Sequence, residues 1–405
     1  MVAVSPTAPR IATPPVSALA RGVADLLAPH PLGASTSIAV RDARTGVELL
    51  AVDADRLVPP ASNTKLLTAI AALRVLGSEH RFTTRLVADT VPGADGVIRG
   101  DLRIVGGGDP SLASADLRAL VDEATTEYGL HEVTGRVRTD DTYLDRTRWA
   151  PAWIPDTRLR DARALGALAV ADDIDGARID PAAMPAPDEH VGRVTGELLT
   201  RASVRVRGDK PGRPAVSPVT PVTLATHESA PLAEIVQFML RRSNSTTAEL
   251  LTRHIGRALT GAGTTAAGAA AITEQLHADS PGVRLLDGSG LALEDRVTTR
   301  AMARVLADAA REPVVGAALV SALAVAGESG TIAKRMVDSP AAGRVRAKTG
   351  TLSDTSALAG LVDRADGRQL AFSINMYPIA SDQRGAARGL QDAIAGVLAT
   401  VDLEA

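Results

Sequence analysis

The chain has 405 residues, a formal net charge of −3, only 2% aromatic residues and no cysteine. Its length is sufficient for two or three domains, and its near-neutral charge and few aromatic side chains argue against nucleic-acid binding. The lack of cysteine excludes disulfides, thiol catalysis and cysteine metal sites, but it does not fix the cellular compartment.

Residues 1–18 are rich in proline, alanine and threonine and read as a flexible linker. They lack the charged segment followed by an apolar segment that marks a secretory signal. The composition is typical of a linker that remains after a signal is removed or omitted, and equally of an ordinary cytoplasmic N-terminus.

The sequence also lacks the patterns typical of membrane-spanning proteins and of histidine metal sites. No stretch approaches about 18 consecutive apolar residues, so we predict no membrane span. The seven histidines show no HxH or HxxxH spacing. We therefore expect neither a metal ion nor another cofactor.

The first regular element is a hairpin over residues 35–54, with a turn around residues 44–46. The next is the apolar segment 60–76, which follows Pro59 and Pro60 and is predicted to form a helix that starts near Ser62. Apolar residues occupy all faces of this helix, as expected for a buried one.

Ser62 and Lys65 stand three residues apart at the start of that helix and therefore lie on one face. Only four of the 44 basic residues are lysines, so arginine serves wherever a fixed positive charge is enough. Burial and the helix dipole both disfavour a charged ammonium at a helix N-terminus. An unprotonated Lys65 could accept the Ser62 proton and make its oxygen a nucleophile.

The middle of the chain divides into two parts. Residues 86–222 are rich in turns, with short strand patterns such as 195–207 and one helix near 112–128. Residues 231–325 show helical periodicity in several segments. Between two of them lies Ser243-Asn244-Ser245, which reads either as a functional loop or simply as an N-cap for the helix that carries Glu249.

Lys348-Thr349-Gly350-Thr351 ends one strand pattern and precedes another. A lysine and hydroxyl groups separated by glycine could hold a carboxylate while the backbone approaches closely. The alternative is a strand turn that merely contains glycine.

The C-terminal part contains a second hairpin and a final helix. Residues 355–377 form a second predicted hairpin around Asp366–Gly367, and residues 385–401 a helix. We predict an α+β domain from residues 19–85 and 223–405, whose two ends build one antiparallel sheet. Residues 86–222 are predicted to be a β-rich insertion of two small domains.

These motifs, SxxK, an SxN-like loop and KTG in this order, are the set found in penicillin-binding proteins and serine β-lactamases. The chain resembles the D-alanyl-D-alanine carboxypeptidase/endopeptidases of the DacB, or penicillin-binding protein 4, type. These are the class C low-molecular-mass enzymes of peptidase family S13. The resemblance also depends on the long gap between Ser62 and Ser243 and on the segments 105–112, 285–291 and 327–332. The resemblance implies their transpeptidase-like fold, an antiparallel sheet with helices and a helical subdomain.

The resemblance also implies roles for the first two motifs. Ser62 would be the acylated nucleophile, Lys65 its base, and Ser243 a relay that passes a proton to the leaving amine. Asn244 and Ser245 would contact substrate. The second motif usually ends in asparagine, and here Ser245 takes that place.

The third motif would recognise the peptide terminus. Lys348 would supply positive charge, and Thr349 and Thr351, with Gly350 between them, would bind the terminal carboxylate of the peptide or of penicillin. The N–H groups of Ser62 and Thr351 would form the oxyanion hole.

The implied activity is a serine D-Ala-D-Ala carboxypeptidase or DD-endopeptidase outside the cytoplasmic membrane. Its partners would be peptidoglycan stem peptides ending in D-Ala-D-Ala and β-lactams, which would acylate it. The alternatives are a catalytically degraded peptidoglycan- or penicillin-binding protein, because of Ser245, and a β-lactamase.

Other features receive structural interpretations from the sequence. Residues 287–290 (Asp-Gly-Ser-Gly) read as a turn that needs positive φ, and Glu249 as support for the start of its helix. Trp149 and Trp153 flank Pro151 and are expected to pack a loop. The family pattern has a tyrosine after this stretch, and this chain has none there.

Overall fold

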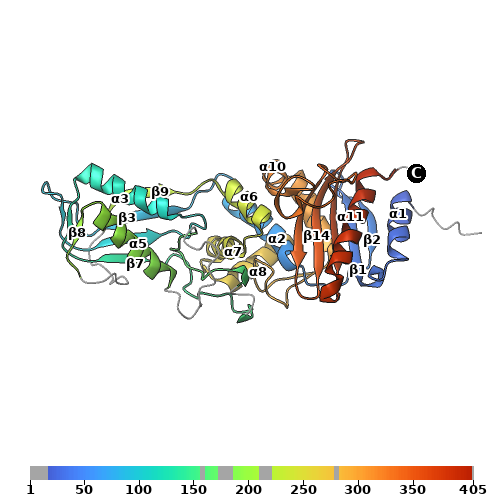
Figure 1. The fold of residues 1–405 in the computed structure, drawn as a ribbon, viewed down its shortest axis with the longest axis horizontal. Coiled ribbons are helices and arrows are strands. Elements are labelled where there is room, and N and C mark those ends of the chain that lie inside the picture. The colour runs from blue at the N-terminus through green and yellow to red at the C-terminus, as the bar shows by residue number, and fades with distance from the viewer. Residues whose placement is uncertain (1–16, 156–159, 172–185, 209–220, 278–281, 404–405) are drawn as a thin grey trace, which may run out of the picture.

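The computed structural model describes residues 17–155, 160–171, 186–208, 221–277 and 282–403. The molecule is elongated (Figure 1), with a large sheet at one end, a group of helices in the middle and a second, smaller α/β unit at the other end. Most of the predicted linker, residues 1–16, lies outside the described residues, and Ser17 caps the first helix.

The large sheet has six strands in the order β12-β13-β14-β15-β1-β2, all antiparallel. β1 pairs with β15, which confirms that the two ends of the chain build one sheet. Both predicted hairpins are present, and their turns contain Gly46 and Gly367 at φ +74° and +81°. The strands span Thr36–Asp42 (β1), Glu48–Val52 (β2), Ala324–Val325 (β12), Val345–Thr351 (β13), Ser356–Asp363 (β14) and Gln369–Met376 (β15).

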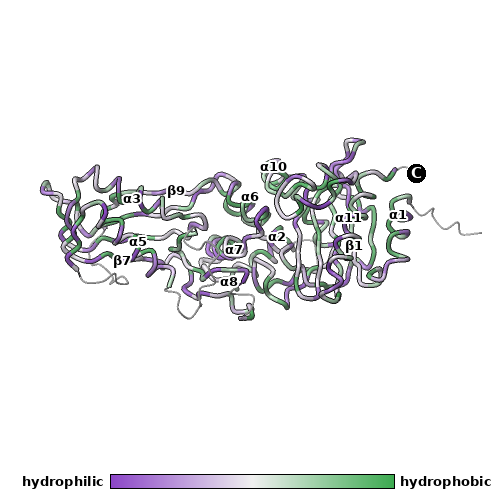
Figure 2. Tube along the Cα trace, in the orientation of Figure 1, coloured by the Kyte–Doolittle hydropathy of each residue, from purple (hydrophilic) through white to green (hydrophobic). Residues whose placement is uncertain are grey.

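Helices cover both faces of this sheet. On the outer face, α1 (Ala18–Leu27) and α11 (Arg384–Thr400) share one apolar core with strands β1, β14 and β15. On the inner face, α9 (Thr299–Arg311) contacts β1 and β15, and α10 (Pro313–Ala322) packs on α9. Figure 2 shows hydrophobic residues along α1 and α10.

The helical group in the middle forms the largest apolar core together with the inner face of the sheet. Its members are α2 (Thr64–Leu76), α6 (Leu232–Arg242), α7 (Ser245–Thr260) and α8 (Thr265–His277). Residues 64–73 of α2 are buried on every face, as its sequence predicts. A two-stranded ribbon of β10 (Val283–Arg284) and β11 (Arg296–Val297) follows α8.

The smaller unit contains a four-stranded sheet in the order β7-β5-β3-β9 and a three-stranded parallel sheet in the order β4-β6-β8. The helices α3 (Ser114–Tyr128) and α5 (Pro187–Arg201) share its apolar core. The strands span Thr83–Ala88 (β3), Val97–Ile98 (β4), Leu102–Gly106 (β5), Glu132–Val133 (β6), Val137–Asp140 (β7), Arg205–Val206 (β8) and Val222–Glu228 (β9).

Because β3 and β9 pair with each other across the start and end of this unit, we propose that it is one insertion bounded by these strands. The predicted division into two small domains stays a proposal, with the two sheets as its units.

The strand predicted over residues 195–207 is wrong. Helix α5 continues to Arg201, and only Arg205–Val206 forms a strand. Pro187 in the first turn favours the helix. Val191, Thr195 and Leu198 recur at helical spacing and are buried, so tertiary packing selects the helix over the local β-branched pattern.

Candidate active site

The start of α2 is a point where three distant segments meet. A 3₁₀ turn over Ala61–Asn63 leads into the helix, and Ala61 has φ +50°, which is unusual for a residue other than glycine. A Cβ atom on Gly290 would lie 1.9 Å from the Ala61 carbonyl oxygen, and one on Gly350 would lie 2.8 Å from the Pro60 oxygen. Only glycine at these two positions allows the backbones to approach so closely.

Ser62 and Lys65 are in direct contact at this point. Lys65 Nζ lies 3.0 Å from Ser62 Oγ and donates a 2.7 Å hydrogen bond to the carbonyl oxygen of Ser289. Ser62 keeps some exposure, whereas Lys65 is completely buried. Burial lowers the pKa of Lys65 to about 8, and nearby Asp287, Glu249 and Asp161 oppose that shift. Lys65 is therefore a base that can lose its proton near neutral pH.

Acylation at Ser62 should consequently depend on pH. The reactive form has a neutral Lys65 amine, whose fraction falls as pH drops through the pKa of about 8. We expect the second-order rate constant with a chromogenic β-lactam to level off above pH 9 and to fall about 50-fold from pH 8 to pH 6. A rate that stays constant between pH 6 and pH 8 would show that another group is the base.

A tight turn centred on Asp287 holds the carbonyl group that binds Lys65. The Asp287 carboxylate accepts hydrogen bonds from the backbone N–H groups of residues 289–292, from Ser289 Oγ and from Trp153 Nε1 at 2.7 Å. Six donors around one buried carboxylate suit its ionised form. The turn therefore fixes the Ser289 carbonyl group at the position where it meets Lys65.

Two other buried carboxyl groups flank Asp287. Glu249 accepts a 2.8 Å hydrogen bond from the N–H of Gly288, and burial, with the charge of Asp287, raises its pKa to about 8. Burial and the same neighbour raise the pKa of Asp295 well above its usual value. These shifts favour the protonated forms of Glu249 and Asp295, whereas the donors around Asp287 suit a carboxylate.

The second motif occupies the corner between α6 and α7. Ser243 follows α6 at φ +57°, and Asn244 caps α7 by accepting a hydrogen bond from the N–H of Thr247 at 2.8 Å. Ser245 is the first residue of α7 and is buried. In the described part of the chain, no hydrogen bond links Ser243 or Ser245 to Ser62 or Lys65.

The third motif lies in β13. Lys348 is buried, and its Nζ donates to the carbonyl oxygen of Thr349 at 2.9 Å. Burial, together with the charge of Lys65, lowers the pKa of Lys348 well below its usual value. Thr349 Oγ1 donates to Thr331 Oγ1 at 2.9 Å, and Thr351 is exposed. A carboxylate bound beside Lys348 would restore its positive charge.

Several residues near the site escape prediction from sequence. Asp287 and Trp153 support Lys65 from distant segments, and Asp161 lies near enough to Lys65 to affect its pKa. The N–H of Arg163 donates to Thr246 Oγ1 at 2.9 Å, so this loop of the insertion touches the start of α7. The sequence Asp-Gly-Ser-Gly indicates a turn at residues 287–290. Only the three-dimensional structure shows that this turn and the other residues lie near Lys65.

Two kinds of feature are absent from the described residues. Across the described residues, no group of three or more histidine or acidic side chains is arranged to hold a metal ion. Within the same part, no helix has both the length and the apolar character to cross a membrane.

Comparisons with known proteins agree with this arrangement. The model of the "D-Ala-D-Ala carboxypeptidase 3 (S13) family" matches residues 19–159 and 166–401. The chain is 35% identical to the D-alanyl-D-alanine carboxypeptidase of Actinomadura sp. (strain R39), with 84% of this chain and 77% of the relative aligned. It is 32% identical to carboxypeptidase DacB of Mycolicibacterium smegmatis, with 95% and 85% aligned.

Solved structures show the same fold. Penicillin binding protein 4 (dacB) from Haemophilus influenzae superposes with a TM-score of 0.79 at 21% identity, covering 93% of this chain and 98% of that one. The penicillin G-acylated endopeptidase Bd3459 from Bdellovibrio bacteriovorus superposes with a TM-score of 0.60 at 20% identity, covering 90% and 91%. These likenesses confirm the predicted transpeptidase-like α+β fold.

Proposed function

Because the chain belongs to the D-Ala-D-Ala carboxypeptidase 3 (S13) family, we propose that it removes terminal D-alanine from peptidoglycan stem peptides through an acyl-enzyme on Ser62. As a member of this family it is a serine-type carboxypeptidase. The contact of Ser62 with a buried Lys65, whose pKa is near 8, is the observation that carries the residue assignment.

Acylation follows from this contact. Neutral Lys65 accepts the proton of Ser62 Oγ, which attacks the carbonyl carbon of the penultimate D-alanine. The N–H groups of Ser62 and Thr351 stabilise the oxyanion, in the positions that family resemblance assigns to them. Ser243 passes a proton to the nitrogen of the leaving D-alanine as the peptide bond breaks. Water then hydrolyses the ester and releases the shortened peptide.

The third motif recognises the terminal carboxylate. Thr349 and Thr351 stand on β13 next to the buried Lys348, and their hydroxyl groups and its ammonium would together bind one carboxylate. The same contacts would hold the carboxylate of penicillin, and opening of the β-lactam by Ser62 would leave a stable adduct. A DD-endopeptidase activity would use the same residues on a cross-linked peptide.

The cellular setting follows from the substrate. Peptidoglycan lies outside the cytoplasmic membrane, so the protein would act there as a secreted or periplasmic enzyme. The named relatives, a D-alanyl-D-alanine carboxypeptidase and carboxypeptidase DacB, support this proposal.

Ser245 should limit the rate of this enzyme. The second motif usually ends in an asparagine, whose amide can both donate and accept hydrogen bonds. The hydroxyl group of Ser245 is shorter and has only one donor. One lost hydrogen bond to a charged or reacting group costs roughly 1.5–3 kcal/mol, or about 10- to 150-fold in rate. We expect Ser245→Asn to accelerate acylation by a chromogenic β-lactam at least tenfold.

Asn244→Ala is the matched variant for this prediction. The Asn244 side chain caps α7, so its loss should cost about 1 kcal/mol of stability with little effect on acylation. If Asn244→Ala abolishes acylation and Ser245→Asn changes nothing, Asn244 is the residue that contacts substrate.

The proposed activity is tested on a purified muropeptide that ends in D-Ala-D-Ala. The wild type should release one D-alanine per peptide, measured by mass spectrometry, and Ser62→Ala should release none. Binding of the peptide without release of D-alanine would identify a degraded binding protein instead.

A further inference from the structure

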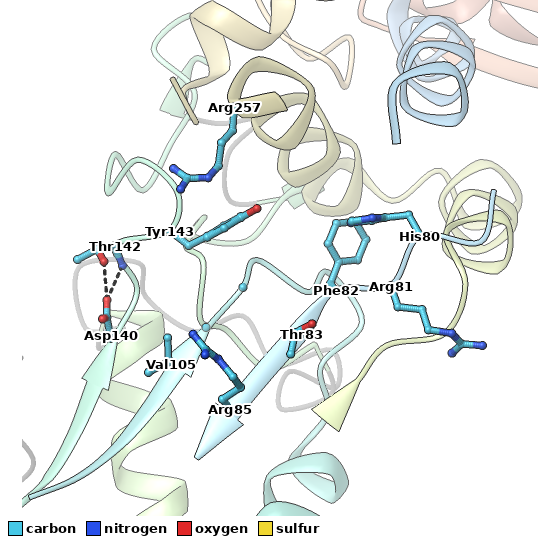
Figure 3. A pocket seen from close by; sticks show the side chains of 12 residues that line it. His80, Arg81, Phe82, Thr83, Arg85, Val105, Asp140, Thr142, Tyr143 and Arg257 are labelled. Atoms are coloured by element: carbon cyan, nitrogen blue, oxygen red, sulfur yellow. Dashed lines mark hydrogen bonds between the residues drawn. The ribbon is translucent and has the colours of Figure 1, made fainter. Parts of the chain in front are cut away.

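A cavity lies away from the three motifs of the active site. It has a volume of about 510 Å³, is lined by residues of β3, β5 and β7 and the loop after β7, and also by Arg257 near the C-terminal end of α7. Figure 3 shows it from close by. None of its lining residues belongs to the motifs of the active site. Arg257 stands twelve residues after Ser245, or about 18 Å further along the helix.

Arginine side chains without acidic partners dominate this cavity. Arg85 extends from β3 and Arg257 from α7, on either side of Tyr143 (Figure 3). In the described chain neither guanidinium has an ion pair, and Arg81 donates only to the carbonyl oxygen of Ser229, at 2.7 Å. The lining holds one acidic residue, Asp140, against these three arginines.

Other arginines of the same sheet do have acidic partners. On its other strands, Arg103 pairs with Asp89 and Arg138 with Asp101. The sheet thus neutralises arginines elsewhere and leaves Arg85 unneutralised at the cavity. Unpaired guanidinium groups in a concave site favour an anion, which they can bind in a bidentate manner.

Tyr143 provides a flat wall between the two arginines. Tyr143 is 40% exposed, and the Arg257 guanidinium carbon lies 4.1 Å from its ring centroid. The His254 ring packs against Tyr143, and Phe82, which also lines the cavity, packs on His254. Burial lowers the pKa of His254 to about 4, so its imidazole is neutral. His80 also lines the cavity, and burial lowers the pKa of its imidazole as well, so the positive charge of the cavity near neutral pH comes from the arginines.

We propose that this cavity binds an anionic saccharide, with separate acidic groups on Arg85 and on Arg257 and a sugar ring against Tyr143. The volume is within the range of small-ligand sites. The assignment of the source, the glycan of peptidoglycan, rests on the proposed function. A carboxylate on a sugar and a phosphate on another wall polymer share this chemistry, and the test separates them.

The test uses glycan strands from which the stem peptides have been removed. Each muramic acid then presents a free carboxylate, and no peptide can enter the Ser62 site. We expect the double variant Arg85→Gln/Arg257→Gln to bind these strands at least tenfold more weakly than the wild type, by fluorescence anisotropy. The matched control is Arg118→Gln, which replaces an exposed arginine of α3 and should bind within twofold of the wild type.

The outcomes decide both the site and its ligand. Wild-type binding should weaken at higher salt and stay constant between pH 7 and pH 8, where the arginines stay charged and the lowered pKa of His80 leaves its imidazole neutral. Unchanged affinity in the double variant, with wild-type thermal unfolding, would overturn the site. Binding of poly(glycerol phosphate) but not of the glycan would overturn the saccharide assignment. Penicillin adduct formation on the wild type is measured separately, so failure of the Ser62 mechanism is distinguishable from failure of this cavity.

Discussion

Lys65→Arg should reduce acylation of Ser62 by penicillin about 10²- to 10⁴-fold. The variant keeps a positive charge but cannot lose a proton, because a guanidinium stays protonated in proteins. General-base catalysis contributes rate factors of this size. The rate constant of acylation, followed by stopped-flow or by intact mass, measures the effect.

Lys348→Arg is the control for this variant. Lys348 is also completely buried, but its proposed role needs charge and not proton transfer, so about a tenfold loss is expected. Because arginine is larger than lysine and Lys65 is completely buried, Lys65→Met tests the same point without added bulk. A near-normal rate in both Lys65 variants, with normal thermal unfolding, would show that Lys65 is not the base.

Asp287→Asn should lower both stability and activity. The substitution removes the charge that six donors surround and turns one acceptor into a donor that faces them. Loss of one partner in a buried charged network costs roughly 3 kcal/mol or more. With the turn disturbed, the Ser289 carbonyl group no longer fixes Lys65, and we expect acylation to fall about 100-fold.

Asp295→Asn is the matched control, since burial and the neighbouring Asp287 raise the pKa of this carboxyl group and favour its neutral form. The asparagine carbonyl oxygen can keep the hydrogen bond from the N–H of Leu286, so stability should change by less than about 1 kcal/mol. Trp153→Phe removes a single donor and should have an intermediate effect. If Asp287→Asn and Asp295→Asn behave alike in denaturant unfolding and acylation, the charge of Asp287 has no special role.

Local patterns in the sequence predict much of the architecture. The two hairpins and the helix that follows Pro60 depend on turn residues and periodicity within about 20 residues. The placement of Ser62 beside Lys65 follows from helix geometry alone. Even the joint sheet of the two termini could be anticipated, because the strands flank a helical middle.

The support of the site could not be predicted in the same way. The Asp287 turn lies more than 200 residues from Lys65, and its sixth donor, Trp153, comes from the insertion. Periodicity does not indicate which distant segments touch, so their contact cannot be predicted from a single sequence. The strand expected at residues 195–207 failed for a related reason, since burial of one face of α5 decides its structure.

The most direct test of the account is the mass and position of the penicillin adduct. Intact-mass analysis after incubation with penicillin should show one covalent adduct, and peptide mapping should place it on the peptide that contains Ser62. Ser62→Ala should show none. An adduct on another residue, or an equal yield in Ser62→Ala, would contradict the assignment of Ser62 as the nucleophile.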